Sequence, residues 1–353
     1  MKSKARISDI AKQCGVSIST VSLVLNDKPG VSQETRSRVL EVAAELQYPI
    51  NPPCPSGNGS NLTTVGMVVK TDPDQPPQAN PFYSKVILGI EDACRRSGIN
   101  LLFATLPVDE KNRPVDAPSI LYNDMVDGLL MVGTFVDETI ATISKKHFLP
   151  MVLVDGYSDS ESFDTAVSDN FHAAYQAVKF LIEKGHHHIG LAGGENNCYP
   201  SLIERRDGYF RALKDHEISE TYTANFNINK SPGYQEIFNL LKENPQITAL
   251  FCVNDDVASA AIRAAHDLGK NVPEDISIIG YDDTYIAAGS HPALTTMHVD
   301  TIALGRAAVH LLSLRVENPD SARMTLTIHS NLVERDSVGL CKSLSAKKDD
   351  PLK

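Results

Sequence analysis

Two pairs of adjacent aspartates are the residues of this 353-residue chain whose types and positions could serve ligand chemistry. Asp255-Asp256 and Asp282-Asp283 each follow an apolar segment that reads as a strand, residues 249–253 and 277–279. The carboxyl ends of strands are where open α/β sheets bind ligands. Capping the next helix is an equally common role for such aspartates. The sequence leaves both roles open for each pair.

A run of three histidines, residues 186–188, is a candidate for metal binding. Adjacent side chains point in different directions, and the run leads into an apolar strand, so we interpret it as the start of that strand. The chain also has no Walker lysine loop, no HExxH, no GxSxG and no GxGxxG after a strand. We therefore expect no metal, no cofactor and no catalytic residue, which argues against an enzyme.

The elements that must position these residues alternate between strands and helices after residue 62. Apolar segments predict strands at 65–69, 101–104, 128–132, 151–154, 188–191, 249–253, 277–279 and 295–299. Amphipathic segments predict helices near 83–97, 137–147, 170–184, 202–216, 233–243, 255–268 and 301–317. This alternation is typical of an α/β protein with parallel sheets. Because roughly 280 residues are many for one such sheet, two lobes are expected.

The first 48 residues read instead as a helix-turn-helix followed by a third helix. Gly15 suits the end of the first helix, and Ser17 and Ser32 suit the N-caps of the next two. Apolar residues recur at helical spacing: Ile10, Ala11 and Cys14; Val21, Val24 and Leu25; Val39, Leu40, Ala43 and Leu46. Two short helices, a tight turn and a polar face on the second helix are the parts of a major-groove reader.

Charge separates this segment from the rest of the chain. The whole protein carries a formal charge of −11. The first 48 residues hold seven cations against five anions: Lys2, Lys4, Arg6, Lys12, Lys28, Arg36 and Arg38 against Asp9, Asp27, Glu34, Glu41 and Glu45. Such an asymmetry indicates nucleic-acid contact. A small helical bundle without nucleic acid is the alternative interpretation.

Bulk properties bound the remaining possibilities. The length allows two or three domains. No apolar run approaches the length of a membrane span and the N-terminus lacks an apolar signal core, so a cytoplasmic protein is expected. Six cysteines without metal spacing predict reduced thiols. Residues 49–62 are rich in proline and glycine and are expected to form a linker, and residues 341–353 a polar, frayed tail.

Several short motifs resemble those of the lactose/galactose repressor family of bacterial transcription regulators, over residues 6 to about 340. They are ISDIA (7–11), GVS (15–17), TVS (20–22), LN (25–26), NPF (80–82), GLLM (128–131), GH (185–186), RRDGY (205–209), ND (254–255), GYDD (280–283) and LTT (294–296). The resemblance implies a ligand-responsive regulator, most simply a repressor. It binds as a homodimer to a pseudo-palindromic operator in double-stranded DNA, and its small effector is a sugar or related metabolite.

The resemblance also implies a domain organisation. Residues 1–48 form the three-helix headpiece, and residues 63–340 form a two-lobed core similar to periplasmic sugar-binding proteins. Crossover strands join the lobes, so each lobe is discontinuous in sequence. The expected first lobe holds residues 63–165 and 296–322, and the second holds 166–295 and 323–340. The tail contains only Leu344 and Leu352 as large apolar residues, too few for a heptad seam, so a dimer is expected rather than a tetramer.

Carried over residue by residue, the resemblance implies that the second helix enters the major groove. The expected DNA-contacting residues are Ser8, Ser17, Ile18, Ser19, Thr20, Ser22, Leu23, Asn26 and Ser32. Many members have arginine where this chain has Leu23, and leucine cannot make a bidentate guanine contact. Ile18 suits a thymine methyl, with a place in the headpiece core as the alternative. Ser17 and Thr20 suit phosphate.

The same resemblance implies an effector site between the lobes. Its expected residues are Phe82, Asp155, Arg205, Asn254 and Asp282. A fixed guanidinium and groups that donate and accept hydrogen bonds suit a sugar or polyol. The alternative for Arg205 is an ion pair that braces a helix. Ile228 and Val299 stand where members often have an aromatic residue and glutamine, which indicates a less polar pocket.

The linker departs most from the family. Members usually have a short helix there, with a leucine that wedges into the minor groove. Here Pro52, Pro53 and Pro55 follow Asn51, and Gly57 stands at the leucine position. Prolines and glycine disfavour that helix, so we expect the segment to stay non-helical and the operator to be bent little. A sugar-binding receptor and an enzyme on a Rossmann-like core are the competing classes. The receptor would need a secretion signal and would have no use for residues 1–48, and the enzyme would need a catalytic constellation that the sequence does not show.

Overall fold

The computed structural model describes residues 7–25, 30–46, 62–71, 80–109, 113–116, 119–122, 125–136, 140, 142, 149–158, 163–195, 199–228 and 230–342. The chain divides into two compact units, Met1–Gly59 and Ser60–Lys353, and each is considered by itself. The expectations about Asn26, the linker with its proline-rich hinge, and the tail with Leu344 and Leu352 fall outside the described residues.

The N-terminal unit contains three helices in its described part: α1 (Ile7–Cys14), α2 (Ile18–Leu25) and α3 (Gln33–Glu45). Gly15 has φ +65° and allows the chain to leave α1. The Ser17 hydroxyl accepts a hydrogen bond from the Thr20 amide at 3.0 Å, as an N-cap does. The three helices enclose a small core: Ile10, Ala11, Cys14, Val21, Val24, Val39, Val42 and Ala43. The expected helix-turn-helix is confirmed.

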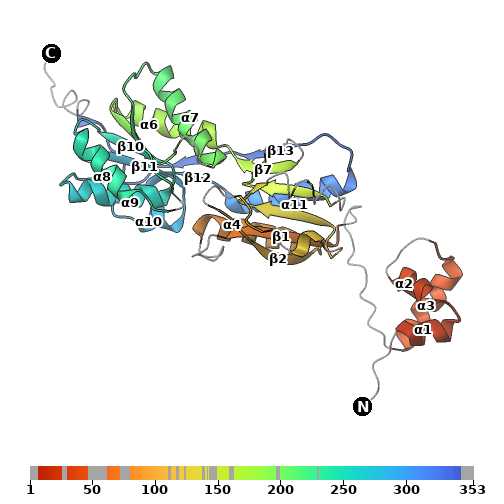
Figure 1. Ribbon diagram of the computed structural model, residues 1–353. Helices are drawn as coiled ribbons and strands as arrows, with labels where there is room; N and C mark the ends of the chain where they lie inside the picture. Colours follow the sequence, from red (N-terminus) through yellow and green to blue (C-terminus); the bar gives the residue numbers. More distant parts are fainter. Residues whose placement is uncertain are drawn as a thin grey trace. The chain divides into compact units, whose positions relative to one another are not determined.

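The larger unit contains two six-stranded sheets, one in each lobe (Figure 1). The first lobe has the order β13-β7-β5-β3-β1-β2, with strands Thr325–Ile328, Asp164–Ser168, Met151–Val154, Gly128–Val132, Thr64–Thr71 and Asn100–Pro107. The second has the order β14-β12-β11-β10-β8-β9, with strands Asn331–Val333, Thr295–His298, Ser277–Asp282, Ala249–Cys252, Ile189–Ala192 and Tyr222–Ala224. All pairs are parallel except β12 with β14. A two-stranded sheet, β4 (Phe135–Val136) with β6 (Tyr157–Ser158), and a short 3-10 helix (Ser119–Tyr122) complete this set.

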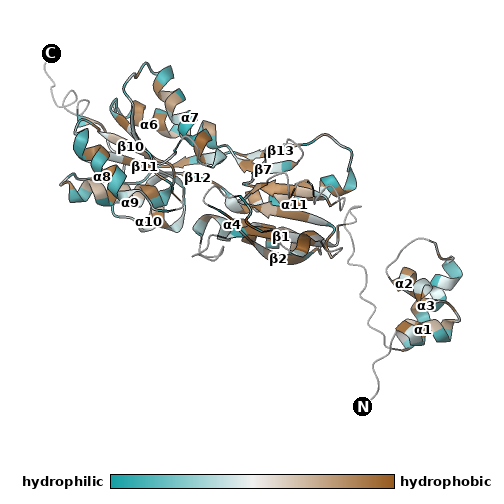
Figure 2. Ribbon diagram, viewed as in Figure 1, coloured by the Kyte–Doolittle hydropathy of each residue, from teal (hydrophilic) through white to brown (hydrophobic). Residues whose placement is uncertain are grey.

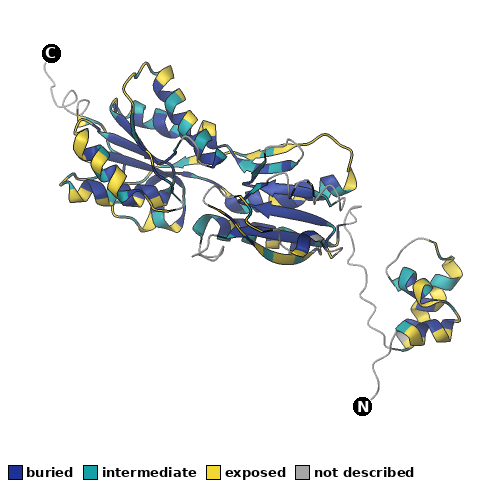
Figure 3. Ribbon diagram, viewed as in Figure 1, coloured by how far each residue is buried: buried dark blue, intermediate teal, exposed yellow. Residues whose placement is uncertain are grey.

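Helices cover both sheets. In the first lobe α11 (Thr301–Glu317) packs on α4 (Pro81–Arg96) and on β3, β5 and β7. In the second lobe α6 (Asn170–Glu183) packs with α7 (Pro200–Asp215). The remaining helices of this lobe are α8 (Tyr234–Glu243), α9 (Asp255–Asp267) and the short α10 (Tyr285–Gly289). Apolar central strands lie beneath helices whose outward faces are polar and exposed, which is the layering of an α/β protein (Figures 2 and 3).

The chain crosses between the lobes three times, after β7, after β12 and after β13. The expected boundaries differ slightly from these crossings. Residues 325–328 were assigned to the second lobe, yet β13 pairs with β7 in the first sheet. Likewise β12 (Thr295–His298) belongs to the second sheet, although the expected boundary falls at residue 296. The β13 sequence Thr-Leu-Thr-Ile is half exposed and has no continuous apolar run, so the sequence does not predict this edge strand.

Most predicted elements match the structure within a few residues. The described residues add six strands that the sequence does not predict: β7, β9, β13 and β14, of three to five residues, and β4 and β6, of two residues each. The expected helix near 137–147 lies largely outside the described residues. Seven of the eight predicted strands lie inside their sheets, where apolar runs are required, and the eighth is the edge strand β2. The missed strand β7 is also interior, but buried and half-buried residues alternate along it.

Candidate functional site

Asp155 lies directly after β5, at the carboxyl end of the first sheet, and is 5% exposed. One of its carboxylate oxygens, Oδ2, accepts a hydrogen bond from the Tyr83 hydroxyl at 2.8 Å. Its other oxygen, Oδ1, is buried without a hydrogen-bond partner among the described residues. Burial raises the pKa of Asp155 to about 6, although the Tyr83 hydrogen bond and the charges of Arg205 and Lys70 oppose the shift.

Arg205, on α7, lies at the carboxyl end of the second sheet and is also 5% exposed. Its Nε donates to Asn170 Oδ1 at 2.9 Å, and its NH1 donates to the Val253 carbonyl at 2.7 Å. The guanidinium stacks on the Tyr281 ring, 3.7 Å from the ring centre. These contacts hold the guanidinium in one orientation. The alternative of an ion pair that braces a helix stays open in part: Arg205 does pair with Asp282 at 3.1 Å, and it is buried among groups from several elements.

Asp282 ends β11 and lies beside Arg205. Its Oδ1 is 3.1 Å from Arg205 NH2. That contact is an ion pair without hydrogen-bond geometry, so Oδ1 is buried without a hydrogen bond among the described residues. Burial raises the pKa of Asp282, and Arg205 opposes the shift. Asp155 and Asp282 have φ of 46° and 99°, a left-handed backbone that costs energy for non-glycine residues.

Hydrogen bonds join the two lobes around these groups. The Tyr199 hydroxyl, just before α7, donates to the Asp155 carbonyl at 2.8 Å. The Tyr157 hydroxyl, from β6, donates to Glu204 Oε2 at 3.2 Å, and Asn170 donates to the same oxygen at 3.1 Å. We call this set the inter-lobe cluster: Tyr83, Asp155, Tyr157, Asn170, Tyr199, Glu204, Arg205, Tyr281 and Asp282.

Two further residues border the inter-lobe cluster. Phe82 packs against the apolar cores of both lobes, and its ring meets that of Tyr83 edge-on at 5.2 Å. Lys70, from β1, is 9% exposed, and its Nζ lies 5.1 Å from the centre of the Tyr83 ring and 5.7 Å from that of Tyr199. Aromatic faces and a buried ammonium therefore surround the two carboxylates.

The structure brings Phe82, Asp155, Arg205 and Asp282 together as the sequence predicts. It also adds residues that the sequence analysis did not identify: Lys70, Tyr83, Tyr157, Asn170, Tyr199 and Glu204. One signal was present, because Tyr83 directly follows the recognised NPF motif and Tyr157 lies two residues after Asp155. Tyr199 and Glu204 come from the other lobe, and no local pattern marks them.

The remaining strand-end residues have structural partners. Asn254 caps α9, its side-chain oxygen accepting from the Val257 amide at 2.9 Å. Asp255 accepts from the Thr284 amide at 2.7 Å, the Thr284 hydroxyl at 3.0 Å and the Thr296 hydroxyl at 2.7 Å. Asp283 contacts Arg335 at 2.6 Å. The structure therefore separates the aspartates by role. Asp255 and Asp283 have structural partners within the second lobe, whereas Asp282 faces Arg205.

The histidine run is structural. His186 is 2% exposed, with Nδ1 3.0 Å from the Thr248 hydroxyl and Nε2 3.2 Å from the Gly339 carbonyl. His188 instead faces the Tyr222 hydroxyl at 3.1 Å. Their side chains therefore do not converge. Within the described ranges, no group of three or more histidine, cysteine or acidic side chains is arranged to hold a metal ion.

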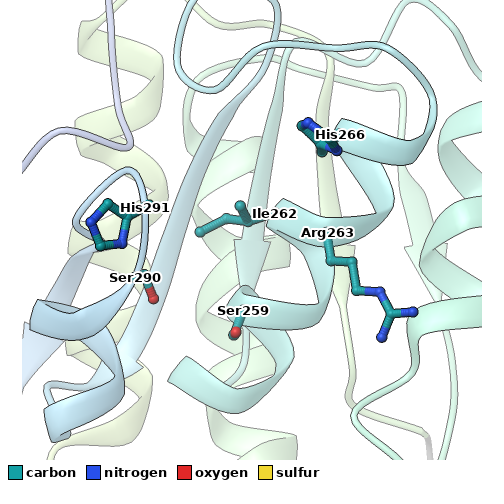
Figure 4. A pocket seen from close by; sticks show the side chains of 6 residues that line it. All are labelled: Ser259, Ile262, Arg263, His266, Ser290 and His291. Carbon is teal, nitrogen blue, oxygen red and sulfur yellow. The ribbon is translucent and has the colours of Figure 1, made fainter.

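A separate hollow of about 300 Å³ lies on the second lobe (Figure 4). It is lined by side chains of α9 and of the loop after α10: Ser259, Ile262, Arg263, His266, Ser290 and His291. Arg263 and His266 have side chains 75% and 87% exposed. Such an open hollow does not enclose a small ligand, and none of the predicted effector residues lines it.

The predicted DNA-contacting residues are largely accessible in the N-terminal unit. Ser8, Ser17, Ser19 and Ser32 are exposed, and Thr20, Ser22 and Leu23 are half-buried. Ile18 is 54% exposed, and the alternative that it belongs to the headpiece core is wrong. The Ser17 hydroxyl lies 2.6 Å from that of Ser19 and 2.8 Å from that of Thr20. The Ser17 hydroxyl thus bonds to the hydroxyls of both Ser19 and Thr20 at the start of α2.

Comparison with known proteins bears on both units. Residues 6–51 match the model of bacterial regulatory proteins of the lacI family, and residues 178–338 match a periplasmic binding protein-like domain. The HTH-type transcriptional repressor PurR of Aliivibrio salmonicida is 33% identical over 337 residues, covering 95% of this chain and 99% of the relative. PurR of Klebsiella pneumoniae is also 33% identical, over 341 residues.

Solved structures show the same architecture. A complex of the transcriptional regulator CelR with cellobiose superposes with a TM-score of 0.67 at 26% identity, covering 94% of this chain and 99% of that one. The lac repressor dimer bound to operator and an anti-inducer gives a TM-score of 0.68 at 24% identity, covering 96% and 100%. Among the helices of the described residues, none is long and apolar enough to cross a membrane. The chain belongs to the lacI family of bacterial regulatory proteins, DNA-binding transcription regulators that respond to small-molecule effectors and are not enzymes.

Proposed function

We propose that this protein is a homodimeric repressor, acting in the cytoplasm, whose affinity for a pseudo-palindromic operator is set by a small effector bound within the inter-lobe cluster. The helix-turn-helix and the PurR-type relatives support the DNA-binding half of the proposal. A dimer fits because helix-turn-helix proteins read two half-sites with a two-fold axis between them. Ser8, Ser17, Ile18, Ser19, Thr20, Ser22, Leu23, Asn26 and Ser32 are the proposed DNA contacts.

One observation carries the effector half of the proposal. Asp155 Oδ1 and Asp282 Oδ1 belong to different lobes, are both buried, and both lack a hydrogen bond among the described residues. Leaving such an atom unsatisfied costs about 1–3 kcal/mol for Asp155 Oδ1 and less for Asp282 Oδ1, because the latter lies 3.1 Å from Arg205 NH2. A ligand that donates hydrogen bonds to both oxygens would remove that cost and bridge the lobes.

The chemistry of the neighbouring groups favours a polyhydroxylated effector such as a sugar. Hydroxyls donate to Asp155 and Asp282 and accept from the fixed guanidinium of Arg205. Phe82 provides an apolar face for the ligand, and Asn254 contributes its amide nitrogen because its oxygen already caps α9. The solved structure of CelR is a complex with cellobiose, which supports the sugar class.

Two measurements test this function. First, the full chain is used to select bound sequences from random duplex DNA, and affinity for the enriched site is measured at several salt concentrations. We expect a roughly symmetric site and a steep loss of affinity with salt, since phosphate contacts release counterions. A selection that enriches no site would refute the DNA-binding half.

Second, a panel of sugars and nucleobases is screened by titration calorimetry against the full chain. We expect one class to bind and to change the affinity for the selected operator. If a nucleobase binds and no sugar does, the cluster is still the effector site but the sugar class is wrong. If a ligand that binds has no effect on operator affinity, the regulatory proposal fails.

A further inference from the structure

Helix α2 has an unusual composition for a helix that reads DNA. Its eight residues, Ile-Ser-Thr-Val-Ser-Leu-Val-Leu, include no amide, carboxylate, ammonium or guanidinium group. Bidentate recognition of guanine uses arginine or lysine, and that of adenine uses asparagine or glutamine. None of these contacts is available to α2. Only hydroxyls and apolar side chains can reach base edges from this helix.

The apolar side chains on the outer part of α2 are not needed by the headpiece core. Val21 and Val24 fill the core at 0% and 2% exposure. Ile18 is 54% exposed, and neither Ile18 nor Leu23 packs among the residues that form or border that core. On a helix of 3.6 residues per turn, Ile18 and Leu23 flank Ser19 and Ser22 on the face opposite Val21 and Val24.

The hydroxyls at the start of α2 are already partly engaged. The Ser17 hydroxyl accepts from the Thr20 amide and lies within hydrogen-bond distance of the hydroxyls of Ser19 and Thr20. Their geometry serves the cap of the helix. Serine also pairs with several bases, so it discriminates weakly. Ile18 and Leu23 are therefore the side chains of α2 with the largest capacity to distinguish one base from another.

The major groove offers one apolar feature, the C5 methyl group of thymine. We infer that Ile18 and Leu23 are the specificity-determining residues of α2, and that they read thymine methyl groups in each operator half-site in place of a guanine contact. This inference rests on the proposed DNA-binding function. It adds the base and the atom that the helix recognises.

The test starts from the symmetric site that the full chain selects from random DNA. Each thymidine of that site is replaced in turn by deoxyuridine, which removes only the methyl group, and affinity is measured by fluorescence anisotropy. Burying one methyl-sized group is worth roughly 0.8 kcal/mol, so we expect about a fourfold loss at one or two thymines of each half-site. Replacing both symmetry-related thymines should cost on the order of 15-fold.

Variants link each methyl to its side chain. Ile18→Ala should bind more weakly and should abolish the deoxyuridine penalty at its own thymine, and Leu23→Ala should do so at another. Leu40→Ala is the matched control, because Leu40 is an exposed leucine of the same unit on α3. It should keep both penalties. Circular dichroism checks that the variants remain folded, which the exposure of Ile18 favours.

The possible outcomes distinguish a failure of the thymine-methyl inference from a failure of the proposed DNA-binding function. If a symmetric site is enriched but no deoxyuridine substitution weakens binding, the protein binds specific DNA and the inference is wrong. If the penalties persist unchanged in both Ile18→Ala and Leu23→Ala, other residues read the methyl groups and the inference is also wrong. If no site is enriched, the proposed function fails and the inference fails with it.

Discussion

Two buried arginine–aspartate pairs of this protein have opposite hydrogen-bonding states. Arg315, on α11, and Asp164, on β7, lie in the first lobe with side chains 3% and 0% exposed. Arg205 and Asp282 lie in the second lobe with side chains 5% and 11% exposed. Both pairs place an ion pair in a poorly solvated interior, where an uncompensated charge costs several kcal/mol.

The Arg315–Asp164 pair is saturated. The guanidinium donates to Asp164 through Nε at 2.6 Å and NH2 at 2.9 Å. It also donates to the backbone carbonyls of the following loop, at Asn318, Pro319, Ser321 and Ala322. Asp164 accepts from the Met324 amide at 2.8 Å. This pair fixes the path from α11 to β13 and leaves nothing for a ligand to satisfy.

The Arg205–Asp282 pair is unsaturated. Its shortest contact, 3.1 Å, lacks hydrogen-bond geometry, and Asp282 Oδ1 has no hydrogen bond among the described residues. The backbone of Asp282 is also left-handed, with φ 99°. A strained backbone and a buried atom without a hydrogen bond are both features that cluster at functional sites. The contrast shows that burial alone does not distinguish the two pairs, whereas their hydrogen bonds do.

The largest expected effect is on stability, from Arg315→Ala. The substitution leaves Asp164 buried without its partner, which should cost about 3–5 kcal/mol of unfolding free energy. Urea denaturation followed by circular dichroism or tyrosine fluorescence measures it, since the chain has no tryptophan. Arg306→Ala is the control on the same helix. Arg306 is about half exposed, and its buried partner Asp92 keeps its ion pairs with Arg95 and Arg96, so the substitution should cost less than about 1 kcal/mol.

An Arg315→Ala variant as stable as the control would contradict this prediction, because the saturated pair would then contribute nothing to stability. Arg315→Lys tests whether the charge alone accounts for the contribution. Lysine keeps the charge but has no planar fork for two carboxylate oxygens and several carbonyls. It should recover less than half of the lost stability.

Arg205→Ala should act mainly on binding. Removing the guanidinium takes one partner from the effector and should weaken its affinity by about 1–3 kcal/mol. The loss of stability should be smaller than for Arg315→Ala. Titration calorimetry with the identified effector measures the change, and Arg211→Ala is the control, an exposed arginine of the same helix paired with Asp215. A folded Arg205→Ala variant with unchanged affinity would remove Arg205 from the site.

The Arg205–Asp282 pair could be predicted from the sequence, whereas the Arg315–Asp164 pair could not. Asp282 could be predicted as a site residue because it ends an apolar strand. Arg205 could be predicted because it lies in a recognised motif. Arg315 and Asp164 are 151 residues apart, and β7, with the sequence Asp-Thr-Ala-Val-Ser, has no continuous apolar run, so no pattern joined them. The two aspartate pairs looked equivalent in sequence. Only the three hydrogen bonds to Asp255 in the folded chain distinguish it from Asp282.

The fold was predictable for a related reason. Central strands are apolar over four or five residues because helices cover both faces, and amphipathic helices alternate with them. The edge strands β9, β13 and β14 lack that constraint and escaped prediction. Three of the nine residues of the inter-lobe cluster were predicted: Asp155, Arg205 and Asp282. Tyr199 and Glu204 meet Asp155 and Tyr157 of the other lobe only after two discontinuous lobes have formed.

Low pH should increase the contribution of Asp155 to the unfolding free energy. The folded pKa of Asp155 is about 6, above its unfolded value of 3.8, so the folded protein holds an extra proton between these pH values. Its contribution to unfolding free energy is therefore largest below pH 4 and falls as pH rises through 6. Asp155→Asn should remove this dependence, a difference of roughly 1–2 kcal/mol between pH 4.5 and 7.5.

The difference between wild type and Asp155→Asn isolates this carboxyl, because all other groups are common to both. Asp255, whose pKa burial raises to about 7, should produce a separate fall at higher pH in both proteins. Unfolding midpoints in urea across this range measure both. Parallel pH profiles for the two proteins would show that Asp155 is not perturbed.

The smallest expected effect distinguishes two buried tyrosines. The Tyr199 hydroxyl donates across the lobes to the Asp155 carbonyl at 2.8 Å, and the Tyr209 hydroxyl donates within the second lobe to the Ile189 carbonyl, also at 2.8 Å. Tyr199→Phe and Tyr209→Phe each remove one such bond and should each cost about 0.5–1.5 kcal/mol of stability. Only Tyr199→Phe should also weaken the effector, because only its bond lies between the lobes that the ligand bridges. Equal effector affinities in the two variants would mean that this contact between the lobes, like the Arg315–Asp164 pair, contributes nothing to effector binding.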